Sequence, residues 1–118
     1  MAQNMANVIL IGVEDTIASQ ICRALSVERH WIAQKPRITG ARDLIGADIV
    51  FAGGKPSEYL PLLRRVRDER PALPFVVVTH IPETTEWLDA LEAGATDYYA
   101  SPFETRQIRW LMESVSLR

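Results

Sequence analysis

The chain has 118 residues, of which 47% are hydrophobic and 24% charged, and its formal net charge is −2. These values are ordinary for one globular domain, so we expect a single domain over residues 1–118 with residues 1–6 disordered. A net charge near zero excludes a strongly basic protein built to attract nucleic acid. No apolar run approaches the roughly 18 residues that a membrane span needs. The N-terminus has no secretory-signal pattern, so we expect a cytoplasmic protein.

Two smaller features predict structural roles. Cys22 is the only cysteine, which excludes an internal disulfide, and its amphipathic surroundings indicate a small core residue. A group of arginines is interrupted by Asp68 and Glu69, so its spacing favours a solvated helix face over a phosphate-binding surface. The group consists of Arg64, Arg65, Arg67 and Arg70.

Short apolar runs alternate with amphipathic stretches along the chain, which is typical of parallel strands joined by helices. In the first half, apolar runs and the four-residue spacing of Ile17, Ile21 and Leu25 predict the elements. These are a strand over 8–11, a helix from about 16, a weaker strand over 31–33, a short helix near 41–45 and a strand over 49–52.

The second half is better marked. Pro61 suits the first position of a helix, and β-branched residues predict a strand over 75–79. A further helix should begin near Thr84 and stop at Gly94, a suitable C′ residue. The last helix should open with a capping box over 101–104, in which Ser101 is the N-cap.

The order of strands, turns and helix ends along the chain resembles that of the receiver domain of bacterial two-component response regulators over nearly its whole length. The segment 74–79 is similar to the family's fourth strand with its terminal hydroxyl residue. The segment 93–103 is similar to its helix stop, fifth strand and Lys-Pro-Phe turn. The resemblance implies a flavodoxin-like α/β fold, (βα)5 and doubly wound, with a parallel sheet in the order 2-1-3-4-5 and helices on both faces.

The same resemblance implies that the phosphorylation chemistry is missing. The family has an acidic pair after the first strand, a phosphoacceptor aspartate after the third and a lysine before Pro-Phe. The acidic pair matches Gly12 and Val13, the acceptor Gly53 and the lysine Ser101, so that only Thr79 is retained at the site. Glycine has no nucleophile. We therefore expect a pseudo-receiver with no catalytic residue, no bound metal and no cofactor.

Several alternatives remain open for the residues that follow the predicted strands. Glu14 and Asp15 could form a displaced Mg²⁺ site, although acidic residues also suit the N-terminus of a helix. Asp15 or Asp48 could be a misplaced acceptor, but Asp48 precedes its strand and should lie at the opposite end. Gly53 and the glycine after it most simply serve a tight turn. His80 could plug the site, report pH or lie in solvent.

Receiver domains often transmit their state through the fourth helix, fifth strand and fifth helix, here about 84–93, 96–100 and 102–117. Tyr98 matches the family's aromatic switch position. Trp110 lies off the apolar stripe of its helix and is flanked by Arg106 and Arg109, a composition typical of interface hot spots. We therefore predict a phosphorylation-independent signalling domain that binds a protein partner, or a second copy, through this face and these four residues. The alternative is a small-ligand or nucleotide-binding domain that uses Gly53 and its neighbour.

Overall fold

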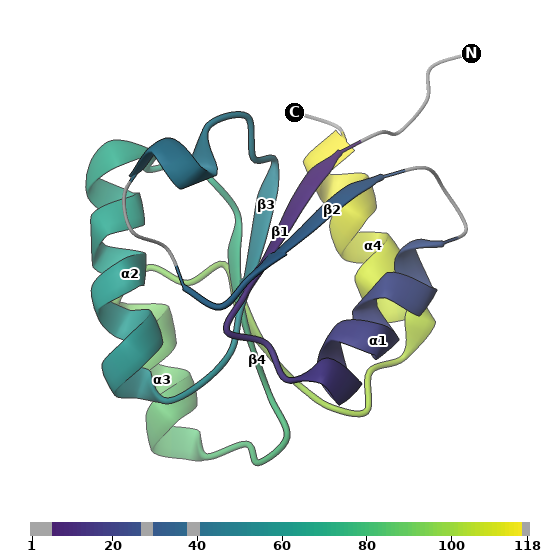
Figure 1. Cartoon of the computed structure of the whole chain (residues 1–118). Helices are drawn as coiled ribbons and strands as arrows, with labels where there is room; N and C mark the ends of the chain where they lie inside the picture. Colours follow the sequence, from purple (N-terminus) through teal and green to yellow (C-terminus); the bar gives the residue numbers. More distant parts are fainter. Residues whose placement is uncertain (1–5, 27–29, 38–40, 117–118) are drawn as a thin grey trace.

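A five-stranded parallel sheet forms the centre of the computed structural model, which describes residues 6–26, 30–37 and 41–116 (Figure 1). The strand order is β2-β1-β3-β4-β5, as the resemblance implied. The bounds are β1 Asn7–Ile11, β2 Trp31–Lys35, β3 Ile49–Ala52, β4 Phe75–Thr79 and β5 Asp97–Ala100. β3 is buried at every position, because helices cover both of its faces and its sequence is apolar throughout.

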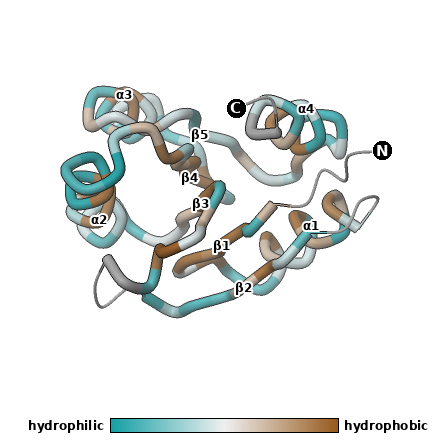
Figure 2. The backbone as a smooth tube through the Cα atoms, turned by 90° about the horizontal axis from the view of Figure 1, so that it is seen from above, coloured by the Kyte–Doolittle hydropathy of each residue, from teal (hydrophilic) through white to brown (hydrophobic). Residues whose placement is uncertain are grey.

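Four α-helices cover the two faces of the sheet (Figure 2). α1 (Asp15–Leu25) and α4 (Thr105–Ser116) lie together on one face, where Ile21 and Ile108 join the core cluster around Phe51. α2 (Pro56–Glu69) and α3 (Thr84–Glu92) lie on the other, where Leu63 and Ala90 join a second cluster. Residues far apart in sequence thus bury the sheet from both sides, which confirms the flavodoxin-like fold.

Two predicted helices differ from the structure. The one expected near 41–45 is only the 3₁₀ helix η1 (Ala41–Leu44), so there are four α-helices among the described residues rather than five. The helix expected from Pro61 begins five residues earlier, with Pro56 in its first turn and Pro61 inside it. Tyr59, Leu63 and Val66 are its buried residues, a stripe that already starts before Pro61.

The arginine group is not wholly a solvated face. The Arg67 guanidinium donates to the carbonyl oxygens of Gly94 and Leu73, at 2.7 Å each, and ties α2 to the loops before β4 and β5. Arg70 donates to the Leu44 carbonyl at 2.7 Å and so holds η1 in place. These two side chains position elements of the fold.

Ala6, the first described residue, is packed against the start of β2. Of the segment expected to be disordered, residues 1–5 lie outside the described part, whereas Ala6 is buried and its N–H donates to Nδ1 of His30 at 3.1 Å. The expectation was therefore wrong for Ala6.

In the ranges that the structure describes, every helix is too short or too polar to cross a lipid bilayer.

Candidate functional site

The carboxyl ends of the strands bring Gly12, Val13 and Gly53 into direct proximity. The Gly53 N–H donates to the Ile11 carbonyl at 2.9 Å, which fixes the β3 end against the β1–α1 loop. A Cβ atom at Gly53 would lie 2.9 Å from the Gly12 carbonyl oxygen and 3.2 Å from the Val13 Cα. Backbone cannot retreat as a flexible side chain can, so the position that matches the phosphoacceptor has no room for a side chain.

The adjacent glycines Gly53 and Gly54 serve different purposes. Gly54 has φ +93° and Gly12 has φ +61°, in the left-handed region that glycine adopts without strain. Gly53 is not among the positive-φ residues; what its place demands is the close approach of the β1–α1 backbone. The expected turn role is thus met by Gly54, while Gly53 closes the site.

The acidic residues nearest the site, Glu14 and Asp15, lie at the start of α1, whereas Asp48 lies at the opposite end of the sheet. Glu14 precedes α1, and its carboxylate lies 3.3 Å from Nε2 of His80 rather than capping the helix. Asp15 lies in the first turn of α1. At the opposite end of the sheet, the Asp48 carboxylate accepts the Asn7 N–H at 2.8 Å, which agrees with the placement expected for it.

These residues do not fit the Mg²⁺ site of a receiver domain. The positions that the resemblance assigns to the acidic pair are a glycine and a valine, and Glu14 has an imidazole beside its carboxylate. In the described ranges, no three side chains of His, Cys, Asp or Glu gather as a metal would require. His80 thus lies beside Glu14 over this edge, a placement that the sequence left open.

The Thr79 hydroxyl, the one group of the site that the resemblance retains, is held by its own loop and by the Tyr98 side chain. The Ile81 N–H donates to Thr79 Oγ1 at 3.1 Å, and the hydroxyl lies 3.4 Å from the Ile81 carbonyl oxygen. Such a local turn satisfies the hydroxyl without a ligand. The Thr79 carbonyl accepts the Ser101 N–H at 2.7 Å, which brings the β4 and β5 ends together.

Ser101 is not the N-cap of the last helix, so the capping-box prediction was wrong. α4 begins at Thr105, the Ser101–Pro102 peptide bond is cis, and Ser101 Oγ donates to Oε1 of Gln20 at 2.9 Å. The helix start is instead supported by Gln107, whose Oε1 accepts the Glu104 N–H at 3.0 Å. Ser101, at the position that the resemblance assigns to the lysine, therefore links the end of β5 to α1.

Replacing Ser101 with alanine should lower the free energy of unfolding by about 0.5–1.5 kcal/mol, the usual value of one such hydrogen bond. Denaturant melts of Ser101→Ala, Gln20→Ala and the double variant measure it. The double variant should cost less than the sum of the single ones, because both remove the same bond. Strict additivity would contradict a contribution from this hydrogen bond.

The Tyr98 side chain points inward. It is 9% exposed, and its hydroxyl accepts the Glu83 N–H at 3.4 Å in the loop that precedes α3. Burial raises the pKa of Tyr98, with smaller contributions from the nearby carboxylates of Glu86 and Glu83, so the phenol stays neutral. The aromatic switch position is thus packed against the β4–α3 loop.

A shallow groove of about 400 Å³ runs along α3 and β5 beside Tyr98. It is lined by Pro82, Glu83, Thr84, Trp87, Tyr98 and Ala100. Only Ala90 of α3 is fully buried, whereas Trp87, Leu88 and Leu91 are exposed large hydrophobic residues. The sequence alone allows Trp87 to be either buried or on this face, and the two leucines were not predicted to be exposed. The signal was that four apolar residues within five positions are more than one buried stripe requires.

On α4, the Trp110 side chain is 62% exposed while Ile108, Leu111 and Met112 are buried. The expected position of Trp110 off the core stripe is therefore confirmed. Arg106 lies 3.5 Å from the Glu104 carboxylate, and Arg109 is exposed. Whether these residues contact a partner stays a prediction.

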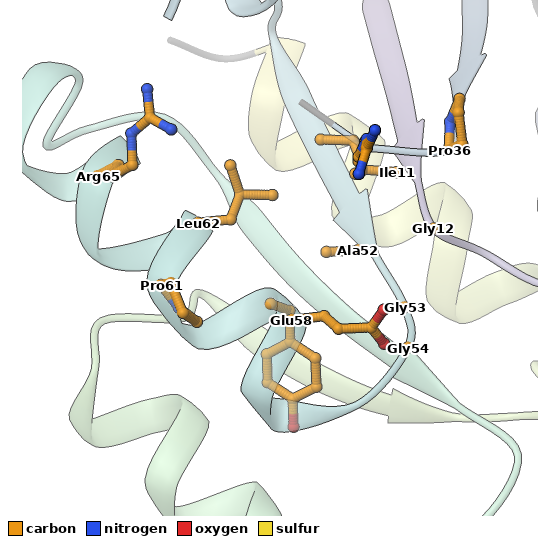
Figure 3. A pocket seen from close by; sticks show the side chains of 12 residues that line it. Ile11, Gly12, Pro36, Ala52, Gly53, Gly54, Glu58, Pro61, Leu62 and Arg65 are labelled. Carbon is orange, nitrogen blue, oxygen red and sulfur yellow. The ribbon is translucent and has the colours of Figure 1, made fainter. Parts of the chain in front are cut away.

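A second hollow, of about 250 Å³, lies between the β1 and β3 ends and α2 (Figure 3). Gly12, Gly53 and Gly54 form its backbone wall, and Leu62 and Arg65 of α2 line the other side. The Glu58 carboxylate beside it accepts the Lys55 N–H at 2.8 Å and belongs to the capping of α2. This hollow is where a small molecule would meet the glycines.

Together, the strand order and the helices on both faces give this chain the fold of response-regulator receiver domains. NtrX from Brucella abortus is similar with a TM-score of 0.78 and 22% identity, over 96% of this chain but 28% of its own. An orphan response regulator of H. pylori gives 0.74 and 23%, over 99% and 100% of the two chains. A two-component response regulator from Clostridium difficile gives 0.78 and 19%, over 96% and 97%. Neither protein-family models nor curated proteins give a match.

Proposed function

We propose that this chain is a pseudo-receiver: a cytoplasmic signalling domain of a two-component-type pathway that acts by protein binding without phosphorylation and without catalysis. The observation that carries the proposal is the closed acceptor position. A Cβ at Gly53 would lie 2.9 Å from the Gly12 carbonyl oxygen, so an aspartate cannot occupy this position unless the backbone of the β1–α1 loop moves. The lysine position, Ser101, bonds Gln20 instead of facing a phosphoryl oxygen.

Acetyl phosphate or beryllofluoride with Mg²⁺ should neither modify nor stabilise the protein. Aspartyl phosphorylation needs a carboxylate nucleophile, and stabilisation of the charged product needs a metal and a cation. Intact-mass spectrometry and melting curves with and without the reagents measure both effects. A phosphorylatable receiver domain treated in parallel serves as the positive control. A stoichiometric adduct that hydroxylamine removes would overturn the proposal.

The proposed partner surface is the α3–β5–α4 face, which corresponds to the family's fourth helix, fifth strand and fifth helix. It offers the groove beside Trp87 and the exposed ring of Trp110, together with Arg106 and Arg109. Tyr98 takes part mainly by shaping the groove, because little of its side chain is exposed. Large aromatic side chains next to arginine are the residues that most often anchor protein interfaces.

A small-ligand site is the second candidate, favoured by the hollow beside Gly53. It lies at the β1 and β3 ends, where the strand order reverses and where open α/β sheets bind ligands. A thermal-shift screen of nucleotides, flavins and inorganic phosphate tests it. A saturable rise in melting temperature that Arg65→Ala abolishes would favour this function, whereas no shift with any ligand would leave partner binding as the function.

A further inference from the structure

The β2 edge of the sheet is exposed and apolar. β2 is the outermost strand and, within the described residues, pairs with β1 alone. Four of its five residues are exposed, including Ile32 and a tryptophan, Trp31, that is 64% exposed. In the described part of the chain, η1 is the next element after β2, and Ile45 after it is 79% exposed. An exposed edge strand of this kind is a template for pairing with another strand.

The backbone of this edge has a defined polarity. The Trp31 N–H donates to the Ala6 carbonyl and the Lys35 carbonyl accepts the Gly12 N–H, each at 2.9 Å. In a parallel ladder, residues that bond to one neighbour alternate with residues that face the other side. The N–H and C=O groups of Ile32 and Gln34 therefore point outward from the sheet.

We propose that two copies of this chain pair through β2 in antiparallel fashion, about a two-fold axis at Ala33, and form one continuous sheet. Ile32 then lies opposite Gln34 of the second copy, and each such pair exchanges two backbone hydrogen bonds. The small side chain of Ala33 meets its own copy at the axis. The inference is independent of the proposed function, because it rests on the opposite edge of the sheet from β5.

The side chains of the edge favour a second copy over an unrelated strand. Trp31 and Lys35 lie on one face of β2, since their β1 partners Asn7 and Ile11 are four residues apart on a single strand. In the proposed register, each Trp31 ring lies opposite Lys35 of the second copy, and the symmetry repeats this cation–π pair. A shift of two residues in either direction separates the ring from the ammonium group, so the chemistry selects this register.

Sedimentation velocity from about 1 μM to about 1 mM should show a monomer–dimer equilibrium, since a single short edge strand gives a small and weak interface. Trp31→Lys should raise the dissociation constant about tenfold or more, because two ammonium groups then face each other. Adding Lys35→Glu to that variant should restore dimerisation through a cross-strand ion pair. Gln34→Pro should also abolish the dimer, because it removes an outward N–H while the bonds to β1 remain.

Circular dichroism melts of each variant show whether the monomer remains folded. Ile81→Ala is the control, since it removes an exposed apolar side chain from the β4–α3 loop and should leave the dissociation constant unchanged. Trp87→Ala tests for a dimer through the α3–β5–α4 face instead. A monomer at every concentration would overturn the proposal. So would a dimer that Trp87→Ala abolishes while Trp31→Lys does not, or a failure of Lys35→Glu to rescue a folded Trp31→Lys variant.

Discussion

Replacing Gly53 with aspartate should destabilise the protein and still leave it unable to accept a phosphoryl group. The new Cβ would lie 2.9 Å from a backbone carbonyl oxygen of the β1–α1 loop, and that loop is bound to β3 through the Gly53 N–H. Overpacking of this kind typically costs about 1–3 kcal/mol. The carboxylate adds a charge at a buried position without a metal or lysine to balance it. Urea melts and intact-mass spectrometry with acetyl phosphate measure the two effects.

Two further variants separate the steric effect from the effect of charge. Gly53→Ala introduces the same Cβ without a charge and should retain most of the destabilisation. Ser57→Asp adds a carboxylate to the first turn of α2, where Ser57 is exposed, and should be neutral or slightly stabilising. If Gly53→Asp melts like the wild type and becomes phosphorylated, the β1–α1 loop can move aside and the site is not closed.

The fold was largely predictable because its strands are apolar runs with little competing pattern. The strand over 75–79 is rich in β-branched residues and was predicted with its full bounds. Gly94 follows α3 with φ +104°, as expected of a C′ glycine. The strand order came from the resemblance, since periodicity alone does not order strands. A glycine at the position that matches the acceptor was visible in the sequence as Gly53. The close approach of the Gly12 carbonyl was not, because this contact joins loops about 40 residues apart.

Local patterns failed where a distant partner decided the outcome. Ser101 begins a sequence that matches a capping box, yet its hydroxyl donates a hydrogen bond to Gln20 on another helix. Pro61 matches a helix start as well as Pro56 does, and Tyr59, one turn before Leu63, was the signal that the helix begins earlier. The short helix near 41–45 lacked an apolar stripe, and the structure has only a 3₁₀ turn there.

Partner affinity should depend on two tryptophans of the α3–β5–α4 face. Trp87 is 42% exposed and lines the groove beside Tyr98, and Trp110 is exposed on α4. If each is a hot spot, alanine substitution should weaken partner binding by about 1–3 kcal/mol, a factor of about 5 to 150. The melt of Trp110→Ala should be nearly unchanged, because its ring lies off the core. Trp87→Ala should lower stability slightly, because part of its ring is buried.

The measurement begins with a pull-down from the native host, with the wild-type chain and each variant as bait, and continues as a titration of the purified partner. Trp31→Ala is the matched control, since it removes an equally exposed indole from the far edge of the sheet. Binding that is lost with Trp31→Ala and kept with both other variants would move the partner site to β2. The proposal attributes the partner affinity to rigid aromatic rings that bury a large area. Binding that survives all three substitutions would therefore contradict the role of these tryptophans as anchors.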